Sequence, residues 1–257
     1  MTTPPSRLER LLLPLGTALL ALAAWQAGVM ATRTDVFPLP GEVLRGIGEL
    51  ARRGVLAAYV GDSLRRVLLG YGSAAALGIV LGLLLGRAPF AQRLANPLIQ
   101  MLRPISPLAW MPLAVIWFGV SELAPVFLIF LAAFFPVGVA TLNAVRNIPP
   151  MYFQAASNFA LPRWRMLRRV IFPAIVPRVL TGLRVALGIA WMVVVAAEML
   201  AVDSGLGYLI IDSRNAGKRY DLVVAGMLMI GVIGLGLDLL MRRLERLPSV
   251  RWGFREG

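Results

Sequence analysis

The chain has 257 residues, of which 58% are hydrophobic, and its mean hydropathy is +0.75. Soluble domains contain about 45–50% apolar residues, so this composition disfavours a soluble enzyme or a secreted module. Cysteine and histidine are both absent, which excludes disulfides, catalytic thiols and imidazole chemistry and argues against zinc sites. The net charge of +13 fits nucleic acid or a membrane, and the membrane is favoured because the basic residues flank long apolar runs.

Six apolar segments are long enough to cross a bilayer, which takes about 20 residues in a helix. In chain order they are 11–31, 67–86, 101–119, 124–145, 179–201 and 222–241. Backbone groups in lipid need internal partners, so all six are predicted to be helices. The first follows two arginines, as a signal peptide would, but its length and the arginine at position 33 favour a retained membrane helix.

The outer loop after the first span contains apolar residues at helical spacing from 41 to 58, with charged residues between them. This pattern predicts one amphipathic helix. It either lies on the outer membrane face or acts as a packing strut between spans.

The second span carries small residues at every fourth position, which form one smooth stripe along a helix. The stripe consists of Gly70, Ala74, Gly78, Gly82 and Gly86. It predicts close packing of another helix, either within this chain or at a sliding or subunit interface.

The third span contains three prolines, Pro104, Pro107 and Pro112. Proline removes a hydrogen-bond donor and kinks a helix. This span is therefore predicted to be bent or partly unwound, and to face protein rather than lipid.

The orientation follows from the basic residues. With the amino terminus in the cytoplasm, 17 of the 26 basic residues and three acids fall in inner segments, against nine basic residues and eight acids outside. The positive-inside bias therefore predicts that both termini are cytoplasmic.

Two acids, Glu198 and Asp238, lie inside the predicted spans. A charge within the membrane is costly and usually finds a partner. We expect Glu198 to pair near the outer membrane face with Arg66 or the arginine before it, or with backbone donors. Asp238 is expected to pair either with Arg184 on the fifth span or with Arg242, one turn later on its own helix.

The inner segment 147–177 separates the fourth and fifth spans. Pro149 and Pro150 can open a short helix there, and Pro162 closes it. The aromatic and small residues of this helix predict a face that needs a pocket, either in this protein or in a partner.

Segment 147–177 resembles the cytoplasmic loop of inner-membrane subunits of bacterial ABC importers. The family pattern is Glu-Ala-Ala, three residues, Gly, nine residues, Ile, any residue and Leu-Pro. The spacing is complete here, with Gln for Glu, Ala for Gly and Phe for Leu. The resemblance implies a coupling helix that docks in a cleft of the ATPase subunit. The residues implied in ATPase coupling are Tyr152, Phe153, Gln154, Ala155, Ala156, Phe159, Ala160 and Pro173.

The resemblance covers about 61–241 and is closest to the subgroup that imports nitrate, taurine, aliphatic sulfonates and bicarbonate. It is carried by RPISPLAWMPLAVIWFG (103–119), LTGLRVALGIAWMVVVAAEML (180–200) and SGLGYLI (204–210). It implies an all-α polytopic protein with six transmembrane helices and a cytoplasmic coupling helix, the type I ABC importer fold. The implied location is the bacterial inner membrane.

The resemblance also implies a second copy of this chain, ATP-binding subunits and a periplasmic or lipid-anchored binding protein. Membrane lipid is expected as a partner and nucleic acid is not. No cofactor or metal is expected in this chain, because its only Gly-Lys pair, 217–218, has Asp212 where a phosphate-binding loop needs glycine. ATP and magnesium are expected on the ATPase subunit, so the chain itself is not expected to be an enzyme.

Three functions remain open from the residues. The first is the permease of an ABC importer for a small oxyanion or organic anion, with an aromatic acid or a pyrimidine as further substrates. The second is an ion-coupled secondary transporter, although no internal repeat is visible. The third is a membrane-embedded lipid-modifying enzyme, although the sequence lacks the cluster of acids that such an enzyme would need. The expected division is 1–60 (first span and outer helix), 61–245 (transmembrane core) and 246–257 (cytoplasmic tail).

Overall fold

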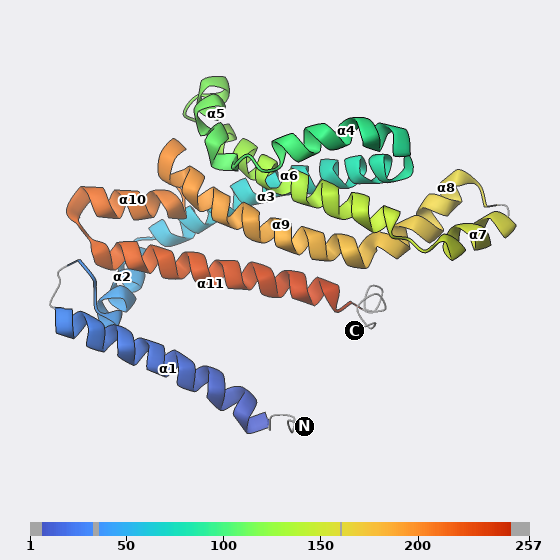
Figure 1. The fold of residues 1–257 in the computed structure, drawn as a ribbon. Helices are drawn as coiled ribbons and strands as arrows, with labels where there is room; N and C mark the ends of the chain where they lie inside the picture. The colour runs from blue at the N-terminus through green and yellow to red at the C-terminus, as the bar shows by residue number, and fades with distance from the viewer. Residues whose placement is uncertain (1–6, 33–35, 160, 248–257) are drawn as a thin grey trace. The chain divides into compact units, whose positions relative to one another are not determined.

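The computed structural model describes residues 7–32, 36–159 and 161–247, and every regular element in these ranges is a helix (Figure 1). The helices before the coupling segment are α1 (Arg7–Thr32), α2 (Pro40–Arg52), α3 (Val55–Arg87), α4 (Pro89–Leu102), η1 (Pro107–Trp110), α5 (Met111–Phe118) and α6 (Leu123–Arg146). The later ones are α7 (Pro150–Asn158), α8 (Arg163–Met166), η2 (Leu167–Ile171), α9 (Phe172–Ala201), α10 (Leu206–Gly217) and α11 (Tyr220–Glu245).

Five of the described helices are long and apolar enough to cross a membrane, or six if the bent pair α4 and η1–α5 forms one span. The prediction of an all-helical protein with several membrane spans is therefore confirmed. The helices extend beyond the apolar runs, however. The second span, predicted from 67, lies in α3, which begins at Val55, and the fifth, predicted from 179, lies in a helical stretch that runs from Trp164 to Ala201.

The outer amphipathic segment is two helices, and the prediction of one helix over 41–58 is wrong. The first, α2, ends at Arg52, and Gly54 adopts a φ of 70° before α3 begins. Such a conformation is accessible to glycine and commonly terminates a helix. Val43, Gly46 and Leu50 are buried on α2, so this helix packs against protein along one side.

The third predicted span is broken, as its prolines indicated. The two apolar pieces, Pro89–Leu102 and Pro107–Phe118, meet at an angle of 85°. The bend falls between Leu102 and Pro107, where two prolines disfavour helical continuation. The apolar region begins earlier than the predicted 101. The second piece, η1–α5, contacts protein as expected: Ala114 is buried in a cluster with Leu128 and Val193, and Trp110 and Met111 pack against that cluster. No residue of α4 is buried within the described chain.

The chain forms two compact units. One comprises residues 1–58 and 209–229. The other comprises residues 59–208 and 230–257 and contains most of the candidate spans.

The core of the larger unit is built on α6, which packs along α9 and against the small-residue stripe of α3. Two apolar clusters fill the α6–α9 seam, one around Leu128 and Val193, the other around Val145 and Ile175. Such clusters hold the two long helices together by close packing, which is the main force between helices in lipid.

In the smaller unit, α2 packs beside the start of α11. A Cβ at Gly46 would lie 3.1 Å from Leu222 Cδ2, so the glycine lets the two helices approach closely. The indole N–H of Trp25 on α1 donates to the carbonyl oxygen of Pro38 at 3.2 Å, and its ring meets Phe37 edge to face.

Candidate functional site

The largest fully buried side chain among the described residues is that of Arg66 on α3. Its Nη1 donates to Glu198 Oε1 on α9 at 2.7 Å, and its Nε and Nη2 donate to the two oxygens of Glu122, at 2.7 and 2.5 Å. Nη1 and Nη2 also donate to the carbonyl and hydroxyl oxygens of Ser204. The fork of Arg66 is thereby saturated, which suits the planar geometry of arginine.

The second oxygen of Glu198 binds the start of α10. Glu198 Oε2 accepts from the hydroxyl of Ser63 at 2.9 Å and from the backbone N–H of Gly207 at 3.0 Å. The backbone N–H of Leu206 donates to Ser63 Oγ at 3.0 Å. A carboxylate and a hydroxyl therefore cap the amino terminus of α10, where a negative charge is favourable.

Gly205 allows α10 to come this close. Its φ is 101°, and a Cβ there would collide with the carboxylate of Glu198 and lie 2.6 Å from Arg66 Nη1. Any other residue would displace one of the two charged groups.

We call Ser63, Arg66, Glu122, Glu198 and Ser204 the Arg66 charge cluster. It ties α3, the residue before α6, the end of α9 and the start of α10 together. Arg66 and Glu198 are completely buried, whereas the side chain of Glu122 is 49% exposed. The Arg66 guanidinium holds the pKa of the Glu122 carboxyl below its usual range. The expected pairing of Glu198 with Arg66 is present.

The sequence did not indicate Glu122, Ser63 or Ser204 as partners of Arg66. Glu122 counted only as an outer acid in the orientation argument. Its one visible signal is its place directly before an apolar run, where acids favour helix starts.

A second charge cluster joins α9 and α11. Arg184 Nε donates to Asp238 Oδ1 at 2.6 Å, while Arg242 Nε donates to the other oxygen, Oδ2, at 2.8 Å. Arg184 Nη1 also lies 3.3 Å from Glu245 Oε2. The two partners proposed for Asp238 are therefore not alternatives, because a carboxylate has two oxygens and each binds one arginine.

The predicted coupling helix is α7. It begins at Pro150, and the N–H of Leu161 donates to the carbonyl oxygen of Ala156 at its end. Ala156 is only 3% exposed, and Phe153 packs on the apolar cluster around Val145. Tyr152 is 44% exposed, and Phe159, which follows the helix, is 80% exposed. The aromatic residues are thus divided between this protein's own core and its surface.

The surface beside α7 contains a hollow of about 410 Å³. Its lining includes Tyr152, Ala155, Ala156, Phe159, Arg169 and Pro173. Gln154 is exposed on the same helix. Ala160 lies outside the described residues, and the role of the group in ATPase coupling stays a prediction.

From Arg163 onward the segment before the fifth predicted span is helical, not a loop. A π-helical turn, η2, connects α8 to α9 directly before Pro173. Such a turn accommodates an interruption of the hydrogen-bond ladder, which proline imposes. The helical stretch that leads into α9 therefore begins at Arg163, five residues after α7 ends at Asn158.

The small-residue stripe of α3 faces α6 of the same chain. A Cβ at Gly70 would lie 2.7 Å from Ile129 Cβ, and one at Gly86 would lie 2.7 Å from Val145 Cβ. Gly78 and Gly82 approach the backbone of Gly138 in the same way, and Ala74 is fully buried. Of the two predicted uses of the stripe, the structure shows close packing within the chain.

No group of three or more acidic side chains in the described ranges could hold a metal ion. The chemistry of both charge clusters is that of ion pairs and hydrogen bonds between helices. They can transmit or resist movement between spans.

The profile of the family described as "Binding-protein-dependent transport system inner membrane component" matches residues 77–249. The chain is 35% identical over 245 residues to the taurine transport system permease protein of Escherichia coli, covering 91% of this chain and 87% of that one. It is 38% identical over 189 residues to the nitrate import permease protein of Synechococcus elongatus, covering 73% and 68%.

Among solved structures, a chain of a bacterial alginate ABC transporter superposes with a TM-score of 0.64 at 17% identity. The match covers 94% of this chain and 99% of that chain. At this identity the likeness concerns the fold, which is that of a type I ABC importer permease.

Proposed function

The chain belongs to the family of binding-protein-dependent transport system inner membrane components, and from this premise we propose that it forms the membrane pathway of an ATP-driven importer for a small anion. The relatives named for taurine and nitrate support a sulfonate or an oxyanion as substrate. Both ligand classes are small, carry one negative charge and present several oxygen acceptors.

The observation that carries this function is the placement of α7. This short helix projects exposed Tyr152 and Phe159 beside a hollow, while buried Ala156 and half-buried Phe153 fix it to the protein. Because Phe153 packs on the cluster formed by Val145 of α6 and Ile175 of α9, α7 can convey movement of a docked subunit to both spans. We therefore assign the exposed surface of α7 to the ATP-binding subunit.

The remaining partners follow from the same proposal. ATP and magnesium are bound by the partner ATPase subunits, and this chain acts as a permease and not as an enzyme. A second copy of the chain completes the pathway, and the exposed apolar side chains of α4 and α5, such as Leu98 and Ile116, offer a surface for it. A binding protein delivers the substrate from the periplasm, and both termini lie in the cytoplasm.

The test is reconstitution of this chain in liposomes with its ATPase subunit and its binding protein. We expect uptake of labelled taurine, an alkanesulfonate or nitrate that requires all three proteins and internal ATP. Uptake driven by an ion gradient in the absence of the ATPase would contradict the proposal and favour a secondary transporter. Turnover of a lipid without transport would instead favour a membrane enzyme.

A further inference from the structure

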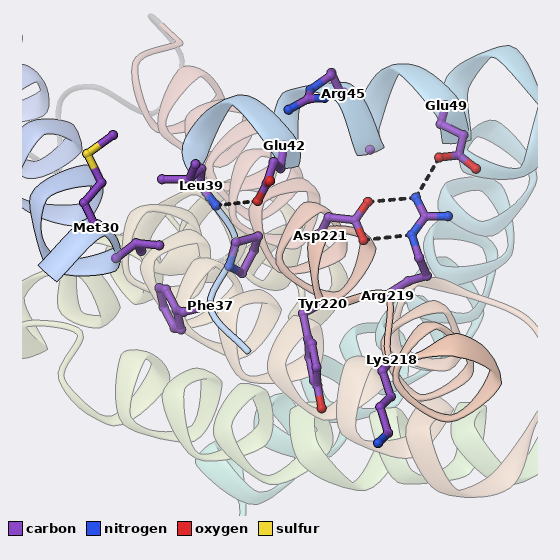
Figure 2. A pocket seen from close by; sticks show the side chains of 13 residues that line it. Met30, Phe37, Leu39, Glu42, Arg45, Glu49, Lys218, Arg219, Tyr220 and Asp221 are labelled. Carbon is purple, nitrogen blue, oxygen red and sulfur yellow. Dashed lines mark hydrogen bonds and ion pairs between the residues drawn. The ribbon is translucent and has the colours of Figure 1, made fainter. Parts of the chain in front are cut away.

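The smaller unit contains a polar cavity of about 820 Å³ between the end of α1, α2 and the residues that open α11 (Figure 2). Three acids and three basic residues line it. They are Glu42, Glu49, Asp221, Arg45, Lys218 and Arg219. Which of these charged groups already have a partner determines what the cavity can bind.

The three carboxylates are already engaged. Glu42 Oε2 accepts from the backbone N–H of Leu39 at 2.9 Å. Arg219 Nη2 lies 2.7 Å from both Glu49 Oε2 and Asp221 Oδ2 (Figure 2). Arg53 Nη2 lies 2.6 Å from the other oxygen of Glu49, so two guanidinium groups balance these two acids. The hydrogen bond from Arg219 holds the pKa of the Glu49 carboxyl below its usual range.

The remaining cations have no acidic partner among the described residues. Arg45 Nε makes only a long hydrogen bond of 3.4 Å to the carbonyl oxygen of Gly41 in its own helix. The ammonium of Lys218 has neither a hydrogen bond nor an ion pair there. Arg45 and Lys218 stand on opposite sides of the cavity in Figure 2, so two cations without an acidic partner flank it.

An apolar groove of about 740 Å³ adjoins this cavity. Its walls include Trp25 and Gly28 of α1 and Met227 and Leu228 of α11. Val29 and Phe37 line both spaces, so the groove and the cavity are continuous. Both helices are candidate membrane spans, and a gap with apolar walls at membrane depth is filled by hydrocarbon or by another helix.

We propose that the joined spaces bind one anionic phospholipid of the bilayer, with an acyl chain in the groove and the headgroup in the polar cavity. An apolar slot that opens into a polar chamber matches an amphiphile, and the two flanking cations favour a negatively charged headgroup. The site fastens α1 and the outer helix α2 to the start of α11 through a lipid.

The test uses native mass spectrometry of the full chain, titrated with phosphatidylglycerol or phosphatidylcholine in detergent. Gly28→Leu fills the groove, because nothing lies within 4 Å of a Cβ at Gly28 and the side chain enters open space. The matched control is Gly16→Leu, which is equally unobstructed on α1 but does not line the groove. For the headgroup, Arg45→Ala and Lys218→Ala are compared with Arg52→Ala, an exposed arginine of α2 outside the cavity.

Wild type is expected to bind the first phosphatidylglycerol more tightly than phosphatidylcholine. Gly28→Leu should abolish this binding, and each of Arg45→Ala and Lys218→Ala should weaken it about fivefold, while both controls match wild type. Equal binding by wild type and Gly28→Leu would overturn the site. Equal binding of both lipids would overturn its anionic character. A Gly28→Cys variant that cross-links to a second protein chain in membranes would show a protein occupant and overturn the proposal.

Discussion

Arg66 and Glu198 are 132 residues apart in the chain, yet Arg66 Nη1 lies 2.7 Å from Glu198 Oε1, and both side chains are completely buried. Taking two charges out of water costs more than their attraction returns unless further hydrogen bonds satisfy them. Ser63, Ser204 and Gly207 supply those bonds. The pair therefore serves to fix which helices meet at this end of the bundle.

Loss of one member of this pair should be strongly destabilising. We expect Arg66→Met or Glu198→Met to cost about 3–5 kcal/mol, because the partner is left as an uncompensated buried charge. The double variant should recover part of the loss. Thermal unfolding in detergent measures this, with Arg65→Met, an exposed neighbour on the same helix, as the control. Additive losses in the double variant would show that the two residues are not coupled.

The Arg66–Glu122 pair should make stability depend on pH. Arg66 lowers the pKa of the Glu122 carboxyl in the folded protein. A depressed carboxyl pKa contributes stability that is present above the unfolded pKa, about 4.3, and is lost as pH falls through the folded pKa. Glu122→Gln should therefore be less stable than wild type near pH 7, by less than about 1 kcal/mol because Glu122 is half exposed.

The measurement is the unfolding temperature of wild type and Glu122→Gln from neutral to acidic pH. The two curves should converge on the acidic side. A difference that stays constant at all pH values would mean that the charge of Glu122 is not what stabilises the folded state.

The sequence predicted those features that depend on a residue's own chemistry. An acid in an apolar span needs a partner, and depth in the membrane limited the candidates for Glu198 to Arg66, the arginine before it, or backbone donors. The prolines of the third span predicted its break. In the first case the need to compensate a charge allows few partners. In the second, the missing N–H of proline allows few helical conformations.

Features that depend on tertiary packing could not be predicted. Hydropathy indicates which part of a helix meets lipid but not where the helix begins or ends. It therefore did not predict that α3 and α9 extend well beyond their apolar segments. The stripe on α3 shows that some helix approaches closely, but nothing in its spacing identifies α6. Likewise the inward face of α7 is set by the core beneath Ala156, which lies in other segments of the chain.

The α3–α6 contact should not tolerate even one added methyl group at its tightest point. A Cβ at Gly82 would lie 2.5 Å from Thr141 Cβ and 2.6 Å from the carbonyl oxygen of Gly138. Gly82→Ala should therefore destabilise the protein by about 1–3 kcal/mol, as overpacking does. Gly72→Ala is the control, because nothing lies within 4 Å of its Cβ on the same helix. Equal stability of the two variants would show that the helices can separate without cost.

Substitutions in α7 should separate folding from coupling. Ala156→Glu would bury a charge in this protein's own core, so it should reduce folded protein as well as transport. Phe159→Ala removes an exposed ring and should leave thermal stability within about 0.5 kcal/mol of wild type. If Phe159 contacts the ATPase subunit, this variant should nevertheless lose stimulated ATP hydrolysis and co-purification of that subunit. Unchanged hydrolysis and co-purification would remove Phe159 from the coupling surface.

The second charge cluster, between α9 and α11, should respond unequally to loss of its two arginines. Asp238 binds Arg184 across two helices and Arg242 within one, while Arg184 also contacts Glu245. Arg184→Ala removes both cross-helix contacts and should destabilise the protein more than Arg242→Ala, whose exposed i,i+4 pair is worth about 0.3–0.5 kcal/mol. Asp238→Ala should resemble Arg184→Ala, since it leaves both arginines without this carboxylate.

A charge swap tests the same link in a second way. Arg184→Asp with Asp238→Arg restores an opposite pair between α9 and α11, but the new arginine stands one turn from Arg242 and is repelled by it. The swap should therefore recover only part of the stability and transport lost in either single variant. Adding Arg242→Ala removes the repulsion and should improve the recovery, with unfolding temperature and uptake as the measurements. If the swap is no better than the worse single variant in either background, the link between α9 and α11 does not depend on this pair.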